Sequence, residues 1–390
     1  MSEVRVLRED DVPAAVELFE RVYPQHRWRS RLACQDYFRE ILFANPWRDA
    51  DLPSWAVEDG DRLCGLYAVL PRRMQLHGRA LRVAVGCQFM VDAGSRRSLV
   101  SLQLARACLA GPQDLTLADG ASDLTRRLWS SICGTASLLH SLHWTRPLRP
   151  ACYALSLLER RAVLPRLLAR AAQALGAIPD ALAARLPANR MLREMPQPAD
   201  EALGAEDMLA QLPAMLRGTA LQPVYDAATL SWLLEQAGRK TRHGALRARL
   251  VRAGGQVIGW YLYYLRPGAA AEVLQVAALE RRFERVLAHM LADAWRRGAS
   301  AAHGRLDPRY AQELSARHCW FRWDNTWTLL HTRDPAIAAA IHAGDAHLSR
   351  LEGEWWLRFL DEDSAVRAPA TLPAAPRARA GSRRAAAGAP

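Results

Sequence analysis

A short turn within residues 91–111, between an apolar run and an amphipathic run, has the layout of a phosphate-binding site. Backbone N–H groups at the start of a helix point toward an anion, and the helix dipole adds positive potential there. Two arginines could make charge-assisted hydrogen bonds to a phosphate, and serine hydroxyls could donate further ones. Glycine would let the backbone approach a phosphate closely, but apart from the early Gly94 the turn has none through residues 96–101, so the sequence predicts weakened binding. The candidate site comprises Met90, Val91, Arg96, Arg97, Ser98, Leu99, Val100 and Ser101.

Polar side chains at the ends of two predicted strands could handle a proton or contact a substrate. Gln88 and Asp92 flank the end of the first strand, and Asp119 and Ser122 follow the second. Asp92 could act as a general base, although an aspartate in a turn more often satisfies nearby backbone groups. Asp119 is therefore the better candidate for a catalytic carboxylate. Gln88 and Ser122 are candidate substrate contacts, and Ser122 is equally suited to cap a helix.

Other arrangements that would indicate a specific chemistry are missing from the sequence. It contains no G-x-S-x-G turn, no H-E-x-x-H motif, no P-loop and no glycine motif for a dinucleotide. His140 and His143 fall on a predicted strand with a spacing that points them to opposite faces, which argues against a joint metal site. The seven cysteines lack C-x-x-C spacing, so we expect reduced, buried thiols and no disulfides. We therefore expect no metal.

Alternating strand-like and helical patterns through residues 4–144 predict the mixed α/β unit that positions these candidates. Apolar alternation predicts the strands, two of which are joined by a tight turn at 77–79 as a hairpin. Helical periodicity and capping residues, such as Asp11 followed by Pro13, predict the helices. The predicted strands are residues 4–9, 54–60, 62–76, 80–91, 115–120 and 136–144, and the helices follow Asp11, span 30–43, follow Ser98 and span 121–133.

The C-terminal part of the sequence repeats the order of the first part. Residues 255–261 align with residues 61–67, which places Gly259 beneath Gly65. A duplication of the whole domain is the economical explanation. The predicted fold class is therefore α/β (α+β), with two mixed-sheet domains.

Composition divides the chain into four stretches. Residues 1–150 and 222–361 carry the two mixed-sheet patterns, and residues 151–221, rich in Ala, Leu and Arg, predict a helical connector. A basic amphipathic helix in this connector could lie on a membrane, but packing across a domain junction is favoured. Residues 362–390 lack aromatic side chains and are predicted to be disordered. Residues 347–359, with Trp355 and Trp356, are predicted to pack against a sheet or between the domains.

Length and charge exclude several classes of partner. The 390 residues, half of them apolar, suffice for two domains. The net charge of +12 includes five arginines in the tail, and other arginines are scattered, so we do not expect nucleic acid as a partner. The first residues are too charged for a signal peptide, and no apolar run approaches a membrane span. These features predict a cytoplasmic protein without a membrane partner and leave its oligomeric state open.

The order of elements resembles the GNAT (GCN5-related) N-acetyltransferase fold over residues 3–147 and again over 222–360. In that family a strand ending in valine leads into a turn with the pattern R/Q-x-x-G-x-G/A, and Val91 and Arg96-x-x-Leu99-x-Ser101 fall where this signature belongs. The resemblance implies transfer of an acyl group from acetyl-CoA, or from another acyl-CoA, to a small-molecule or peptide amine acceptor. The co-substrate would bind in the N-terminal domain, with its pyrophosphate held at the turn. It also implies that Asp119 or Asp92 accepts a proton beside the substrate.

The sequence departs from the family pattern at several positions. Leu99 stands where glycine is expected, and it can still offer its N–H if its φ angle is negative. We expect its side chain then to point into the core. Trp129 stands near the usual tyrosine and cannot donate a phenolic proton. In the second copy Glu280 would repel a pyrophosphate, so we expect this copy to be structural or to shape the substrate site.

Two further functions stay open. The missing glycines and tyrosine also fit a non-catalytic GNAT-fold module that binds a ligand or a protein. A Fem-type peptidyl transferase, which is also built of two GNAT-like halves, would take aminoacyl-tRNA. The net charge allows this reading, but the lack of a clustered basic stripe argues against it.

Overall fold

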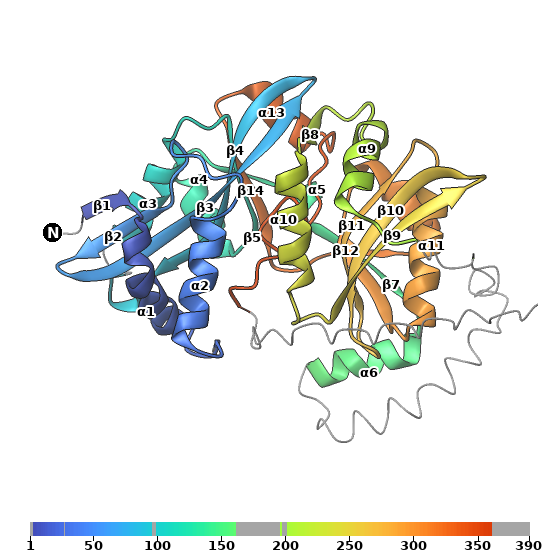
Figure 1. Cartoon of the computed structure of the whole chain (residues 1–390), viewed down its shortest axis with the longest axis horizontal. Helices are drawn as coiled ribbons and strands as arrows, with labels where there is room; N and C mark the ends of the chain where they lie inside the picture. The colour runs from blue at the N-terminus through green and yellow to red at the C-terminus, as the bar shows by residue number, and fades with distance from the viewer. Residues whose placement is uncertain (1–2, 27, 96–98, 161–195, 197–200, 361–390) are drawn as a thin grey trace, which may run out of the picture.

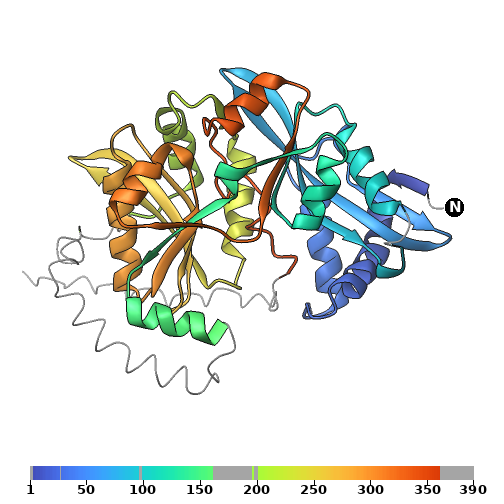
Figure 2. The same ribbon diagram turned by 180° about the vertical axis from the view of Figure 1, so that it is seen from behind.

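The computed structural model describes residues 3–26, 28–95, 99–160, 196 and 201–360. These residues form two mixed β-sheets that lie side by side, with helices packed on them (Figures 1 and 2). The predicted α/β (α+β) class with two GNAT-like mixed sheets is confirmed. Most of the predicted connector and all of the predicted tail at 362–390 lie outside the described residues. No helix in the described ranges is long and apolar enough to cross a membrane.

The first sheet comes mostly from the N-terminal half. Its centre is the predicted hairpin, in which β3 (Arg62–Leu76) pairs with β4 (Arg79–Val91). Successive side chains of β3 face opposite sides: Leu66 packs with α1 (Val12–Val22) and α2 (Arg31–Leu42), whereas Tyr67 packs with α3 (Val100–Leu109). The strand order is β1 (Glu3–Val6), β2 (Trp55–Asp59), β3, β4, β5 (Leu115–Ala121), β14 (Trp327–His331) and β6 (Thr135–Ser137), with β8 (Leu221–Pro223) paired to β3.

The second sheet comes mostly from the C-terminal half. Its strand order is β13 (Trp320–Trp323), β7 (Leu142–Pro147), β12 (Ala301–Arg305), β11 (Ala271–Ala278), β10 (Gln256–Leu265) and β9 (Ala245–Ala253). One face packs on α9 (Ala205–Met215) and α10 (Ala227–Gly238), and the other on α11 (Phe283–Arg296) and α12 (Ala311–Ala316). The remaining helices in the described ranges are α4 (Asp123–Ser130), α5 (Leu138–Ser141), α6 (Pro150–Arg160) and α13 (Pro335–His342), with 3-10 turns at Glu9–Asp11, Ala93–Ser95 and Pro308–Tyr310.

The two halves exchange strands. We expected residues 136–144 to close the first unit as one strand, and this prediction is wrong. The hydroxyl of Ser137 caps the short helix α5, which divides the segment, and β7 then joins the second sheet between β12 and β13. Conversely, β14 from the C-terminal half pairs with β5 and β6 in the first sheet. Strand patterning shows which residues need backbone partners, but not which sheet supplies them.

The two sheets share local details around the aligned glycines. A bulge makes Cys64 the extra residue beside Gly65 in β3, and another makes Ile258 the extra residue beside Gly259 in β10. The carbonyls of Cys64 and Ile258 each accept an N–H, from Asp92 and Leu279 respectively, at 2.9 Å. A Cβ on Gly65 would lie 2.7 Å from Val100 in α3, and one on Gly259 would lie 2.6 Å from Val286 in α11. Glycine therefore lets a helix lie directly on the strand in both sheets.

Candidate active site

A cavity opens where two parallel strands of the first sheet separate. β4 and β5 pair only where Val83–Val85 of β4 face Leu115–Leu117 of β5. Beyond these residues each strand continues without the other. The opening is a cavity of about 590 Å³. Its lining combines the first sheet (Tyr67, Gly86–Phe89 and Ala118–Ser122) with residues of the C-terminal half (Lys240, Arg242, His243, Thr326, Glu354, Trp355, Leu357, Phe359 and Leu360).

Gln88 lies at a bulge in the wall of this cavity. Tyr67 pairs with Phe89 and Ala68 with Cys87, so Gln88 is the extra residue, and its φ angle is +45°. Its side-chain oxygen is buried and accepts no hydrogen bond within the described part of the chain. The sequence placed Gln88 among the substrate contacts, and the structure places it in the cavity lining.

Asp119 is also in the cavity lining, but its carboxylate is fully engaged. Arg305 of β12 donates to one oxygen at 2.5 Å, and the backbone N–H of Glu354 donates to the other at 2.6 Å. A Cβ on Gly353 would lie 2.0 Å from the same carboxylate, so only glycine lets the C-terminal segment pass this close. These contacts favour a role in positioning Glu354 over the role of a base.

Glu354 has the strongest signature of an acid–base group in the cavity. Burial, together with the negative charge of Asp119, raises the pKa of Glu354 to about 8. The backbone of Gln88 and the Arg305 guanidinium oppose this change without cancelling it. A pKa close to neutral pH is what a group needs in order to take up and release a proton during catalysis.

The C-terminal half supplies the facing wall. Lys240, the one lysine of the sequence, donates to the carbonyls of Trp355 and Leu357 at 2.9 and 2.7 Å, which fixes the segment that carries Glu354. The His243 ring stacks on Trp355 with centroids 4.8 Å apart. Burial lowers the pKa of His243 to about 3, so its ring is neutral at physiological pH.

Asp92, the other candidate base, does not line the cavity. Its carboxylate pairs with Arg62 at 2.5 Å and with Arg21 at 3.1 Å. Burial opposes ionisation, but the N–H of Gly94 and the two arginines outweigh it and hold the pKa of Asp92 below its ordinary value. A stable carboxylate in ion pairs at the end of β4 fits the turn role that the sequence favoured.

The turn residues divide into two groups. Arg96, Arg97 and Ser98 lie outside the described residues, whereas Met90, Val91 and Val100 are buried and Ser101 is half-buried at the ends of β4 and α3. Leu99 precedes α3 with a φ angle of −75°, which is the sign that lets its N–H face a ligand. Its side chain is 68% exposed, so the prediction that it points into the core is wrong. Val100 fills the space above Gly65 instead.

Two residues at the second strand end have clear structural roles. The Ser122 hydroxyl accepts the N–H of Thr125 and caps α4, while the residue also lines the cavity, so both of its predicted roles remain compatible. Trp129, near the family's usual tyrosine position, is fully buried against Gly134 and is not part of the lining. Trp356 is core and Trp355 is cavity wall, as the sequence predicted for this pair.

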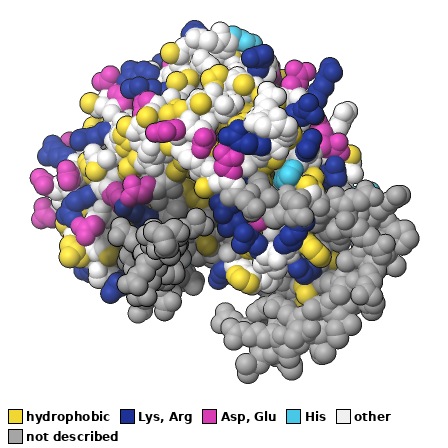
Figure 3. All heavy atoms as spheres, turned by 45° about the vertical axis from the view of Figure 1, so that its right-hand side comes forward, with side chains coloured by type: hydrophobic (Ala, Val, Ile, Leu, Met, Phe, Trp, Pro, Cys, Tyr) yellow, Lys and Arg dark blue, Asp and Glu magenta, His cyan; other side chains and the backbone are white. Residues whose placement is uncertain are grey.

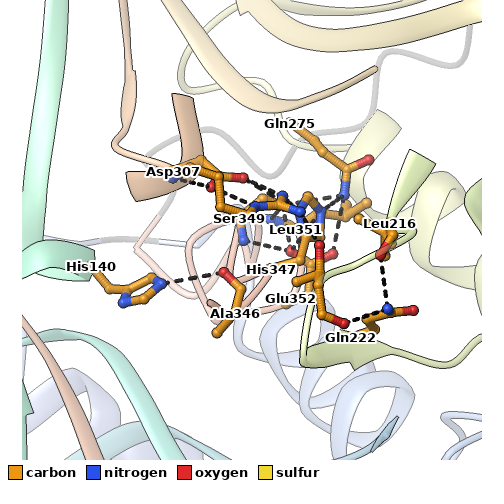
Figure 4. Close-up of polar contacts among 12 residues, drawn as sticks. His140, Leu216, Gln222, Gln275, Asp307, Ala346, His347, Ser349, Leu351 and Glu352 are labelled. Carbon is orange, nitrogen blue, oxygen red and sulfur yellow. Dashed lines mark hydrogen bonds and ion pairs between the residues drawn. The ribbon is translucent and has the colours of Figure 1, made fainter. Parts of the chain in front are cut away.

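The corresponding opening in the second sheet is filled. β11 and β12 pair only where Ala271–Val273 of β11 face Ala302–Gly304 of β12, and the two strands then separate. The cavity beyond this point measures only about 40 Å³. Gln275 accepts a hydrogen bond from Trp260 and donates toward His347, Ser349 and Glu352. Figure 4 shows these side chains converging with Asp307. The second opening is therefore filled by a hydrogen-bonded cluster of side chains, whereas the first is a cavity.

The sequence did not identify Glu354 or Arg305 as site residues. Gly353 before Glu354 and the aromatic pair after it marked a segment that packs closely, but nothing in that pattern showed that it crosses into the first sheet. Arg305 is 186 residues from Asp119 in sequence. Only the exchange of strands brings these groups together.

Part of the cavity wall, including Tyr67 and Gly86–Phe89, lies in a region with a recognisable family. Residues 3–113 match the family model of the acetyltransferase (GNAT) domain. Solved structures with a similar fold include a probable N-acyltransferase from Enterococcus faecalis (10% identity, TM-score 0.53, covering 85% of this chain and 73% of that one). They also include GCN5-related N-acetyltransferases from Anabaena variabilis (11%, 0.56, 86% and 74%) and Kribbella flavida (13%, 0.54, 87% and 73%). The sequence matches no curated protein at a significant level. At these identities the likeness shows the fold.

Proposed function

We propose that the chain is an N-acyltransferase that moves an acetyl group from acetyl-CoA to an amine, because residues 3–113 match the family model of the acetyltransferase (GNAT) domain. One observation carries the proposal: the cavity between the separating strands β4 and β5 has a carboxyl of raised pKa in its wall. Its volume of about 590 Å³ lies in the range of small-molecule sites. We also propose that residues 1–150 and 222–361 are tandem domains and that the protein acts in the cytoplasm.

The N-terminal cleft is the proposed place of acetyl-CoA. β4 leads from the bulge at Gln88 directly to the turn and to α3, whose first N–H groups and dipole favour an anion. The negative φ of Leu99 supports a role for its N–H despite the lost glycine. The residues fit the co-substrate at this end, whereas the filled opening of the second sheet leaves about 40 Å³. The second half then shapes the acceptor side through Trp355 and its neighbours.

Glu354 is the proposed general base. Its ionised form takes a proton from the ammonium group of the acceptor, and the freed nitrogen attacks the carbonyl carbon of the thioester. The C–S bond breaks as the new C–N bond forms, and the leaving thiolate takes the proton that the attacking nitrogen releases. Asp119 acts as a positioning residue, because it holds the Glu354 backbone and its charge raises the pKa of the Glu354 carboxyl.

Thermal stabilisation by acetyl-CoA tests the proposal. Binding stabilises the folded state by RT ln(1 + [L]/Kd), so ligand at 100-fold Kd adds about 2.7 kcal/mol. We expect a melting temperature that rises with acetyl-CoA concentration, with smaller shifts for dephospho-CoA and ATP. Reversing the charges in an Arg96→Glu/Arg97→Glu variant should weaken this response, with an Arg29→Glu/Arg48→Glu variant as the matched control.

The result also separates the alternatives. No shift at millimolar acetyl-CoA would favour a non-catalytic binding module and contradict the enzyme. Salt-sensitive retention of tRNA would favour a Fem-type transferase instead. Basic side chains on the face in Figure 3 are interspersed with acidic ones and form no continuous basic stripe there, so we do not expect nucleic acid to bind.

A further inference from the structure

The exchanged strand β7 creates a second group of chemically active side chains, outside the acyl-transfer cleft. His143 lies on β7, His303 on β12, and Asp324 directly follows β13. The strand register places His143 opposite Arg305 and Thr145 opposite His303. Residues two apart on a strand share a face, so the two histidines are diagonal neighbours on one face of the second sheet.

The three side chains converge. Nε2 of His303 lies 3.1 Å from Oδ2 of Asp324, and Nδ1 of His143 lies 3.9 Å from the same oxygen. One candidate ligand atom from each residue lies within 4.8 Å of the others. Around a tetrahedral Zn²⁺ with bonds of 2.0–2.2 Å, ligand atoms are about 3.4 Å apart. Small side-chain rotations therefore suffice to bring all three atoms onto one cation.

A hydrogen-bonded His–Asp pair does not account for the whole group. Such a pair would satisfy His303 and Asp324, but Nδ1 of His143 is buried and has no hydrogen-bond partner among the described residues. His143 is only 6% exposed, and the ring is stacked on His303 with centroids 5.3 Å apart. Leaving a buried nitrogen unpaired is unfavourable, and a shared cation would relieve it.

Outer contacts hold two of the three side chains, His303 and Asp324, in place. The Thr145 hydroxyl lies 3.0 Å from Nδ1 of His303, and Nε of Arg322 forms an ion pair with Oδ1 of Asp324 at 2.8 Å. These contacts leave Nε2 and Oδ2 facing the centre of the group. Metal-binding histidines and carboxylates typically have such partners, which set the ring orientation and the ligand basicity.

The nearby arginines do not prohibit a cation. Arg305 is paired with Asp119, and Arg350 is paired with Glu272 at 2.9 Å, so each has its own carboxylate. Arg322 shares Asp324 through the outer oxygen only. Each of these arginines thus has its own carboxylate partner, and imidazoles are good ligands for a transition metal.

From this geometry we propose that His143, His303 and Asp324 bind one divalent transition-metal ion, with Zn²⁺ as the best fit. Two imidazoles and one carboxylate, with a position left for water, match zinc in ligand type and number. The ion would join a strand of the N-terminal half to residues of the C-terminal half and thereby fasten the strand exchange. This goes against the sequence-based expectation of no metal, because the three ligands are far apart in sequence.

Metal titration of the full-length protein tests the site. The protein is treated with a chelator, dialysed against Zn²⁺, and its zinc content is measured; Co²⁺ is added separately and its visible absorption recorded. We expect one tightly held Zn²⁺ per chain, a tetrahedral Co²⁺ spectrum and a melting temperature that rises with Zn²⁺. His143→Gln and Asp324→Asn should each abolish the spectrum and lower the zinc content below one. His331→Gln, on β14 outside the group, is the matched control and should retain both.

Two outcomes would overturn the proposal. One is no zinc retained by the folded wild-type protein. The other is equal retention by the wild type and by a His143→Gln/His303→Gln double variant that still melts cooperatively, since the metal would then be bound elsewhere. Because none of these readouts uses acyl transfer, they stay independent of the proposed enzyme.

Discussion

The openings of the two sheets start from the same strand geometry and end in opposite states. In each sheet a central strand pairs with its parallel neighbour over three residues and then separates from it. Gln88 and Gln275 occupy corresponding positions, because each lies three residues before the strand partner of an aligned glycine. These partners are Val91, opposite Gly65, and Ala278, opposite Gly259. Yet the first opening measures about 590 Å³ and the second about 40 Å³. Strand geometry alone therefore does not decide whether such a fold has a binding site.

One segment accounts for the difference. Residues 347–352 cross the second opening, where His347, Ser349 and Glu352 bond to Gln275 and fill the space. The chain then continues past Gly353 to the first opening, where Glu354 and Trp355 become part of the cavity wall. The same stretch thus closes one site and completes the other. The predictions below test this comparison, beginning with the largest expected effect.

Removal of the proposed base should give the largest difference between a substitution in the first opening and one in the second. We expect Glu354→Gln to lower kcat for acetyl transfer by about 10²–10⁴, the usual contribution of a general base. The wild-type rate should rise with pH up to about 8, because the ionised form of Glu354 is the active one. The variant should lose this dependence. The measurement is a pH–rate profile with a panel of amines.

Glu352→Gln in the second opening is the matched control for this measurement. Its profile should keep the wild-type shape. A wild-type profile retained by Glu354→Gln would remove Glu354 from the mechanism.

Arg305→Met should destabilise the fold by about 3–5 kcal/mol, because it leaves the buried Asp119 carboxylate without its ionic partner. Urea unfolding measures this loss. Arg252→Met, which breaks an exposed pair with Glu201, is the control and should have a much smaller effect. Equal losses in the two variants would mean that the strand exchange does not depend on this ion pair.

The raised pKa of Glu354 predicts a pH-dependent stability. The ordinary pKa of this carboxyl is 4.5 and its folded-state pKa is about 8, so the folded protein holds the proton more tightly. The stability that Glu354 contributes is complete below about pH 4.5 and is lost as the pH rises through 8. Relative to Glu354→Gln, the wild type should lose on the order of 3 kcal/mol between pH 5 and 9, measured by urea unfolding.

Glu201→Gln is the control, because the stability contribution of Glu201 changes with pH in the opposite direction to that of Glu354. The hydrogen bond from Arg252 lowers the pKa of Glu201, so its contribution is lost as the pH falls. A wild-type curve parallel to that of Glu354→Gln across pH 5–9 would contradict the raised pKa.

The two corresponding glutamines should give the smallest and most direct contrast. Gln275→Leu removes the partners of Trp260 and Glu352 and should reduce stability by about 1–3 kcal/mol without changing kcat. Gln88→Leu removes an oxygen with no partner and should change stability little, while raising KM for acetyl-CoA or amine. Unfolding curves and initial rates check both variants. If both glutamines affected only stability, the first opening would not be a binding site.

Much of the frame could be predicted from local patterns. The hairpin of β3 and β4, the helix after the turn and the alignment of Gly65 with Gly259 follow from alternation, capping and close packing, which depend on neighbours in sequence. Gln88, Asp119 and Ser122 were expected at the strand ends and do line the cavity. Glu354 was not expected, because its raised pKa results from burial in the folded chain and from the charge of Asp119, which is 235 residues away.

By itself, then, the sequence determined the two mixed sheets, the polar residues at the ends of β4 and β5, and the close packing of residues 347–359. Tertiary structure decided that β7 and β14 exchange sheets, that residues 347–352 fill the second opening, and that Glu354 and Asp119 meet beside Arg305. Periodicity and capping are set by residues within a turn or a strand of one another. Strand partners, desolvation and charge pairs depend on which distant segments share the same space, and only the folded chain defines that.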